Sequence, residues 1–233
     1  MGIPSFLCRD ETVTVTDSFQ YNDKGFSRPP FVVKFSSTQT AVKEFVLIPI
    51  HTKPGNAVKE IDALVDVVKK AKLKWKNNNI MVLGDFNADG KHVKKKDWKK
   101  IRLLDTNKKD FHWLIANGVD TTLAAKSSNT YDRIVVTTEM EKGVVAGSAK
   151  VFDFREEYDL RDKAKKVSDH FPVEVELEAA GAPALVPAAP PGPEAAPRRR
   201  RSRRRSRKSR RSRRSQRSRR SRSHKKTDKN GFR

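Results

Sequence analysis

The sequence has almost no cysteine and no long apolar run. The single cysteine, Cys8, cannot form a disulfide within the chain, so no covalent cross-link stabilises the fold. No apolar stretch approaches the length of a membrane span, and we expect no contact with a membrane. The opening residues, MGIPSFLCRDE, lack the apolar core of a secretion signal. A disulfide-stabilised scaffold and a membrane-spanning protein are therefore excluded.

Acidic residues are scarce at the C-terminal end. Residues 198–233 hold 21 of the 51 lysines and arginines but only one of the 28 acidic residues, Asp228. This Arg/Ser-rich segment cannot bury apolar surface, so we expect a disordered basic tail. Residues 179–197 are rich in alanine and proline, which predicts a semi-rigid linker. Residues 1–178 have nearly balanced charge and are expected to form the folded domain.

Three interpretations of the tail stay open. It is a solvated charged segment, a nuclear-localisation and nucleic-acid-binding segment, or a module that binds Arg/Ser-recognising proteins under control of phosphorylation. We favour the second, with DNA as the main partner and RNA as a further one. It predicts a nuclear location; the alternative is secretion, if a preceding segment carries a signal peptide. The tail has no interleaved aromatic residues, so base stacking is not expected.

Apolar patterns in residues 1–178 predict an α/β domain. Apolar residues at helical spacing in residues 57–75 indicate an amphipathic helix, with Asn56 as its N-cap. Residues 91–104 predict a shorter, basic helix, and residues 111–116 a short apolar segment. β-Branched and aromatic runs predict strands at residues 12–21, 31–35, 44–50, 80–83, 134–138, 144–145, 151–154 and 171–177.

Polar residues of matching chemistry follow several of these strands. They are His51, Asp85, Asn87, Asp132, Asp169 and His170. Ligand sites in layered α/β folds collect at strand ends, and two imidazoles with three carboxylates suffice for metal-assisted hydrolysis. The competing interpretation is a set of unrelated turn residues, because Gly, Asp and Asn are common in turns.

These residues lie in motifs that resemble the deoxyribonuclease I family of the endonuclease/exonuclease/phosphatase superfamily. The motifs GDFN and SDHFP are typical of the superfamily, whereas FSRPPF, IPIHT and YDRIVV resemble deoxyribonuclease I more narrowly. The resemblance covers about residues 12–178. It implies a four-layer α/β sandwich, in which two mixed β-sheets are flanked by helices. It also implies hydrolysis of DNA phosphodiester bonds with divalent cations, Mg²⁺ and Ca²⁺.

The resemblance also implies a role for each site residue. His51 and His170 are the catalytic imidazoles, and Asp132 orients His170. Asp85, Asn87 and Asp169 bind the metal or the scissile phosphate. Two further sets complete the site: Arg28 as a phosphate contact, and Asp120 with Thr122 in a calcium-binding corner.

The sequence departs from the family pattern at its N-terminal side. The family's first third, with a metal-binding glutamate and the glutamate that supports the first histidine, has no counterpart, so we expect an incomplete sandwich. Gly90 and Asn129 stand about where a family disulfide belongs. We expect the apolar faces of residues 31–35 and 45–50 to be exposed or repacked. The resulting hypothesis is a truncated, monomeric nuclease with impaired activity.

Two alternatives remain for function. One is a catalytically inactive nucleic-acid-binding protein that acts through the basic tail. The other is a phosphodiesterase of the same superfamily that acts on lipid or inositol phosphates. The segments around His51 and Tyr131 disfavour this last one because they resemble deoxyribonucleases.

Overall fold

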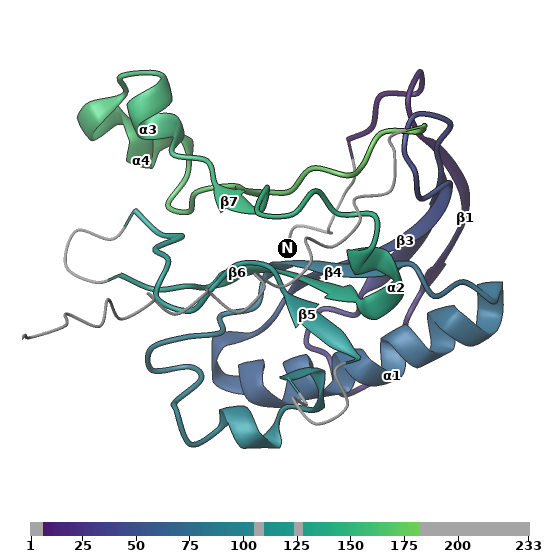
Figure 1. Ribbon diagram of the computed structural model, residues 1–233. Coiled ribbons are helices and arrows are strands. Elements are labelled where there is room, and N and C mark those ends of the chain that lie inside the picture. The colour runs from purple at the N-terminus through teal and green to yellow at the C-terminus, as the bar shows by residue number, and fades with distance from the viewer. Residues whose placement is uncertain (1–6, 105–109, 124–127, 182–233) are drawn as a thin grey trace, which may run out of the picture. The chain divides into compact units, whose positions relative to one another are not determined.

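The computed structural model describes residues 7–104, 110–123 and 128–181, which lie in one compact unit, Met1–Leu185. Its main feature is a six-stranded mixed sheet in the order β1-β2-β3-β4-β6-β5 (Figure 1). The strands are β1 (Thr14–Gln20), β2 (Phe31–Ser36), β3 (Glu44–His51), β4 (Ile80–Asp85), β5 (Phe111–Trp113) and β6 (Asp132–Thr137). The expected basic tail, and the linker from residue 182 onward, lie outside the described residues.

The β3–α1–β4 unit forms the centre of the domain. Strands β3 and β4 are parallel, and helix α1 (Ala57–Trp75) connects them after the short 3-10 helix η1 (Pro54–Asn56). The helix is amphipathic, and its buried residues Ile61, Leu64 and Val68 pack on one face of the sheet. Asn56 is the N-cap residue, as predicted, but its side chain makes no capping hydrogen bond.

Apolar side chains on the other face of the sheet form a second core. Val33, Phe35, Met81 and Val136 are buried there. They are covered by a small sheet of β7 (Lys150–Val151) and β8 (Val173–Glu174), and by α2 (Thr138–Glu141). Figure 1 shows α1 below the large sheet and β7 above it. The predicted α/β class is confirmed: a mixed six-stranded sheet and a small second sheet combine with helices. Of the two sheets only the large one is mixed, because β7 and β8 are antiparallel.

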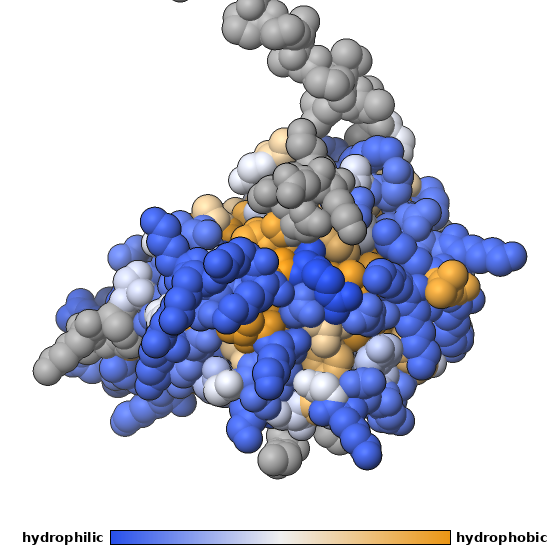
Figure 2. Space-filling view, turned by 90° about the horizontal axis from the view of Figure 1, so that it is seen from below, coloured by the Kyte–Doolittle hydropathy of each residue, from blue (hydrophilic) through white to orange (hydrophobic). Residues whose placement is uncertain are grey.

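The apolar faces of residues 31–35 and 45–50 were expected to be exposed or repacked, and the structure shows that they are buried. Val32, Val46 and Ile48 are fully buried against α1, and Val33 and Phe35 are at most 2% exposed on the opposite face. Seen from the α1 side, the surface is mostly hydrophilic around a central apolar strip (Figure 2). Both cores are therefore closed over these two strands by residues of this chain.

Several element boundaries differ from the sequence predictions. Residues 91–104 contain two 3-10 helices, η2 (Trp98–Lys100) and η3 (Arg102–Leu104), instead of one α-helix. Consecutive lysines repel one another, and the Asp97 side chain accepts the backbone N–H of Lys94 at 3.3 Å, which competes with helical bonding. Residues 144–145 form a single bridge, Val144 to Leu177, and β8 is shorter than the predicted 171–177.

The strand predicted at residues 151–154 ends early because Asp153 caps a helix. Its Oδ1 accepts the N–H groups of Arg155 and Glu156 at 3.0 and 3.1 Å, which starts α3 (Phe154–Glu157). Two further short helices, η4 (Arg161–Lys163) and α4 (Ala164–Val167), follow before β8. No helix among the described residues is long and apolar enough to span a membrane.

Gly84 is the position in β4 where a side chain cannot be accommodated. Its φ is +125°, and a Cβ would collide with the carbonyl oxygen of Ile50 on β3. We expect Gly84→Ala to lower the free energy of unfolding by about 1–3 kcal/mol, because it combines steric overlap with an unfavourable φ. Urea denaturation measures the loss. Gly55→Ala is the matched control, since a Cβ there meets nothing within 4 Å; equal effects of the two substitutions would contradict the prediction.

Candidate active site

Three adjacent central strands of the large sheet place polar side chains side by side where the strands end. The parallel register pairs His51 at the end of β3 with Asp85 at the end of β4. The antiparallel register pairs Asp85 with Asp132 at the start of β6. Paired residues on neighbouring strands lie about 5 Å apart. Hydrogen-bond register therefore brings together residues that are up to 81 positions apart in the chain.

His170 and Asp132 form the closest charged pair of the site. Nδ1 of His170 lies 2.7 Å from Oδ2 of Asp132. This hydrogen bond is the largest cause that raises the pKa of His170 from 6.5 to about 9; burial opposes it. The backbone N–H of His170 donates to Ser168 Oγ at 3.0 Å, which fixes the loop before the ring. Asp132 thus orients an imidazole that is protonated at neutral pH.

Thr121 holds the Asp132 carboxylate, and the sequence prediction missed this residue. It is fully buried, and its Oγ1 donates to Asp132 Oδ2 at 2.7 Å. The same oxygen accepts the N–H groups of Tyr131 and Asp132 at 3.0 and 3.1 Å. The sequence analysis singled out the adjacent Asp120 and Thr122. Only the fold shows that Thr121 contacts Asp132, 11 positions away.

Asp85 lies between the two histidines. Its Oδ1 accepts the N–H of Asn87 at 2.8 Å, and its Oδ2 is 3.4 Å from Nε2 of His51. Burial is the largest cause that raises the pKa of Asp85, and the nearby Asp132 carboxylate acts in the same direction. Asn87 has a φ of 47°, and its Nδ2 donates to the Thr52 carbonyl at 3.1 Å. The amide is thereby fixed at the mouth of the site.

One group of side chains has the composition of a cation site. Single ligand atoms of Asp85, Asp132 and His170 lie within 4.8 Å of one another, the one such group found among the described residues. The carboxylates of Asp85 and Asp132 have little exposure and carry negative charge that a hard divalent cation would neutralise, so they fit Mg²⁺. The protonated His170 ring has no free lone pair to bind a cation. Asp169 is exposed and outside this group, although its charge also raises the pKa of His170.

His51 and Arg28 lie together at the other side of the site. A guanidinium nitrogen of Arg28 donates to the His51 carbonyl at 3.1 Å. The His51 side chain is 51% exposed. Glu60, which the sequence prediction did not single out, fixes both segments from α1. Its two oxygens accept the N–H groups of Ser27 and Lys53, each at 3.1 Å, and the residue is fully buried.

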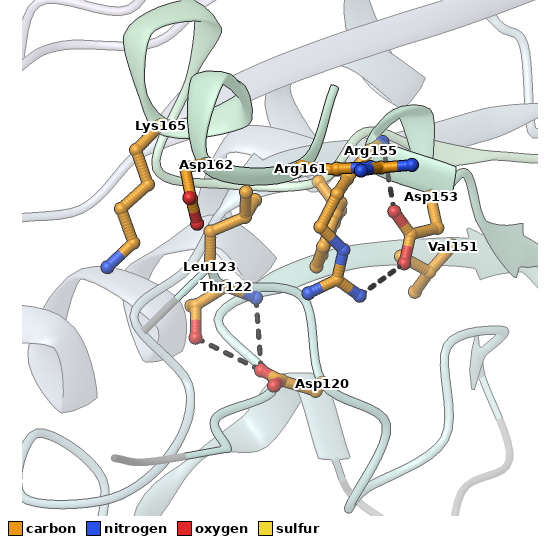
Figure 3. Close-up of a pocket in the computed structure, with 10 residues that line it drawn as sticks. Asp120, Thr122, Leu123, Val151, Asp153, Arg155, Arg161, Asp162 and Lys165 are labelled. Atoms are coloured by element: carbon orange, nitrogen blue, oxygen red, sulfur yellow. Dashed lines mark hydrogen bonds and ion pairs between the residues drawn. The ribbon is translucent and has the colours of Figure 1, made fainter. Parts of the chain in front are cut away.

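The predicted calcium-binding corner, Asp120 with Thr122, is separate from the group of Asp85, Asp132 and His170. Asp120 Oδ1 accepts the N–H and hydroxyl of Thr122 at 3.1 and 3.0 Å, and the N–H of Asn129 at 3.1 Å. Asp120 and Thr122 line a cavity of about 720 Å³ that also contains Asp153 and Asp162 (Figure 3). Arg155, Arg161 and Lys165 line the same cavity, so its charge is mixed. A neighbouring cavity of about 550 Å³ reaches His170 and Asp132.

A buried arginine ties the site to three loops, and its role was also missed from the sequence. Arg133 is 1% exposed, and its guanidinium donates to the carbonyls of Thr130, Ile115 and Ala88 at 3.0, 2.9 and 3.2 Å. The rings of Trp98 and Trp113 lie 5.8 and 5.5 Å from it. Burial lowers its pKa to about 10, so the group stays charged at neutral pH. The one sequence feature that could have pointed to Arg133 is its place in the motif Tyr131-Asp132-Arg133.

The sequence is similar to known proteins over most of its length. The sequence profile of the Endonuclease/Exonuclease/phosphatase family matches residues 6–170. Deoxyribonuclease gamma of Homo sapiens is 46% identical over 186 residues, which cover 76% of this chain and 60% of that protein. Deoxyribonuclease-1 of Bos taurus is 45% identical over 181 residues, which cover 74% of this chain and 63% of that protein. The chain thus spans about three fifths of the length of these relatives.

A solved structure shares the fold at much lower identity. The crystal structure of humanized D. rerio TDP2 aligns with a TM-score of 0.50 and 11% identity, over 73% of this chain and 69% of that one. This similarity supports the fold alone.

The His170–Asp132 pair predicts a specific pH dependence. We expect the His170 ring to titrate near pH 9 by NMR in metal-free protein, and Asp132→Asn to lower this midpoint because it removes the main cause. The folded state holds the proton more tightly than the unfolded chain, whose pKa is near 6.5. The stability from this pair is therefore complete below about pH 6.5 and is lost as the pH rises through about 9.

His92 is an internal control for this titration. Burial and Lys91 lower its pKa below 6.5, so it is expected to lose its proton first. A midpoint of His170 at or below that of His92 would disprove the assignment.

Glu60 predicts a stability effect that originates beside the site. Glu60→Gln leaves one of the two partly buried N–H groups, of Ser27 or Lys53, without an acceptor, because an amide presents only one oxygen. We expect the free energy of unfolding to fall by about 1–3 kcal/mol in urea denaturation. Glu157→Gln, at an exposed glutamate of α3, is the matched control. If both variants unfold at the same urea concentration, Glu60 does not hold the Ser27 and Lys53 segments.

Proposed function

The chain belongs to the endonuclease/exonuclease/phosphatase family, in its deoxyribonuclease I-like branch, and from that premise we propose that it is a divalent-cation-dependent endonuclease that hydrolyses DNA phosphodiester bonds. The observation that carries the proposal is the His170–Asp132 pair at 2.7 Å, with the Asp85 carboxylate beside it. Phosphodiester hydrolysis needs proton transfer and neutralisation of charge at one point, and these groups offer both.

The histidines and Arg28 have distinct roles in this proposal. The His170 ring is oriented through Nδ1 by Asp132, so its Nε2 is directed to a phosphate oxygen or to the attacking water. As an imidazolium it donates a hydrogen bond and adds positive charge; after losing a proton it can act as the base. His51 is the second proton-transfer group, and Arg28 beside it contacts a neighbouring phosphate.

Asp85, Asn87 and Asp169 are the residues that would hold Mg²⁺ or orient the scissile phosphate. When bound, the cation neutralises charge that develops on the phosphate in the transition state. Asp120 and Thr122 would hold Ca²⁺ in a structural role, since their corner also carries the loop of Thr121. Oxygen ligands of this kind suit both hard cations.

A second candidate is a nucleic-acid-binding protein with impaired or absent catalysis. The observation that favours it is that His51 lacks the supporting glutamate expected from the family. Among the described residues, the one carboxylate near the His51 ring is that of Asp85, at 3.4 Å. In this case the basic tail at residues 198–233 supplies the binding to DNA or RNA, or to Arg/Ser-recognising proteins. A nuclear location and a monomeric state belong to both candidates, as predictions from the sequence.

Plasmid cleavage separates the two candidates. We expect the full chain to nick supercoiled DNA with Mg²⁺, and His170→Ala to lower the rate by about 10²–10⁴-fold, because it removes a proton-transfer group. DNA binding in the presence of a chelator should be unchanged, since the tail is intact. His112→Ala is the matched control, because His112 lies on β5 and pairs with Glu141.

Two results would count against the endonuclease. Parent protein that binds DNA without nicking it supports the second candidate. Nicking that survives His170→Ala shows that the activity does not come from this site.

A further inference from the structure

A basic loop, defined as residues 91–100, follows the Asp85–Asn87 segment directly. All six of its lysines are exposed, and Asp97 is its one acidic residue. We propose that this basic loop binds the phosphate backbone of double-stranded DNA next to the scissile phosphate. The proposal rests on the proposed function and names a part of the substrate surface outside the catalytic groups.

The basic loop is anchored to the core at several points. Val93 is 2% exposed, and the Trp98 ring packs edge-on against Trp113 at 5.5 Å. Immediately after the loop, Arg102 pairs with Asp62 and Asp66 on α1 at 3.0 and 2.8 Å. The backbone that carries the lysines is therefore fixed. A fixed array of charges binds a rigid polyanion at lower entropic cost than a mobile arm.

Ring contacts connect the start of the basic loop to the catalytic pair. The His92 ring lies 5.5 Å from the Tyr131 ring, which lies 6.1 Å from the His170 ring. Asp85 is close enough to act on His92 electrostatically. The loop thus begins beside the catalytic groups, where DNA that reaches His170 has its neighbouring phosphates. In Figure 1 the segment after β4 runs outward below the sheet.

The charges of the basic loop are largely uncompensated. Among the described residues Lys100 pairs with Asp97 at 2.8 Å, whereas no ion pair joins Lys94, Lys95 or Lys96 to a carboxylate. By contrast, Lys69 and Lys74 on α1 pair with Asp66 and Asp17. Three consecutive unpaired ammonium groups repel one another, and a phosphate backbone relieves that repulsion while releasing its counterions.

Lysine acylation in the full chain tests the proposal residue by residue. The protein is treated with an acylating reagent, with and without a 20-base-pair DNA duplex, in a chelator that prevents cleavage, and each lysine is read by mass spectrometry. We expect the duplex to protect Lys94, Lys95 and Lys96. Lys69 and Lys72 in the C-terminal half of α1, and Lys76 at its C-cap, should keep their reactivity, because α1 starts near His51 and runs away from the site. The tail does not obscure this result, because each lysine is measured separately.

A matched pair of triple variants gives the quantitative test. Lys94→Gln, Lys95→Gln and Lys96→Gln together should reduce the slope of log affinity against log salt by about 0.9 for each lost phosphate contact. Lys69→Gln, Lys72→Gln and Lys76→Gln together should leave the slope unchanged. Equal protection of both lysine sets, protection of neither, or equal slopes of the two variants would overturn the proposal.

The experiment is independent of catalysis. Parent protein that nicks plasmid while Lys94, Lys95 and Lys96 remain reactive disproves the role of the basic loop and leaves the endonuclease intact. Protein that protects these lysines without nicking leaves the loop as a DNA-binding surface and disproves the endonuclease.

Discussion

The repulsion between Asp85 and Asp132 is the constraint on which the site depends. Their strands are hydrogen-bonded in a register that places the two carboxylates side by side, and both side chains are less than a fifth exposed. Two such charges cannot both persist without compensation. His170 supplies part of it by holding a proton up to about pH 9. Burial is the largest cause of the raised pKa of Asp85, and the Asp132 charge adds to it; a cation would stabilise the charged form of this carboxylate.

Buried polar groups around the carboxylates keep this arrangement from relaxing. Thr121 holds Asp132, Glu60 holds the segments of Arg28 and His51, and Arg133 holds the loop after Asn87. Each of the three is at most 1% exposed and is hydrogen-bonded, so moving it would leave a buried polar group unsatisfied. The positions of the site residues are therefore set by a second, buried set of residues.

The sequence predicted what depends on local pattern and motif. β-Branched and aromatic runs located β2, β3, β4 and β6, and apolar residues at helical spacing located α1, because burial selects such residues in strands and a period of about four in a helix. The strand-end residues His51, Asp85 and Asp132 were predicted together, and register brings them together. Thr121, Glu60 and Arg133 were missed because their partners lie up to 45 residues away and are mostly backbone groups. Residues 91–104 were mispredicted as a helix because buried anchors and apolar periodicity look alike in a short segment.

The distribution of charge around the site explains why a basic loop would be needed beside it. The site gathers the carboxylates of Asp85, Asp132 and Asp169, and under the proposed function their negative charge would repel the DNA phosphate that has to bind there. A cation neutralises the centre of this charge only, since charges separated by more than about 10 Å are screened at moderate salt. The positive charges that attract the flanking phosphates must therefore lie close to the site. Their backbone must also be fixed, so that the lysines do not fold back onto the carboxylates. Residues 91–100 meet both conditions: His92 is in ring contact with Tyr131, and Val93 and Trp98 fix the lysines on the outside.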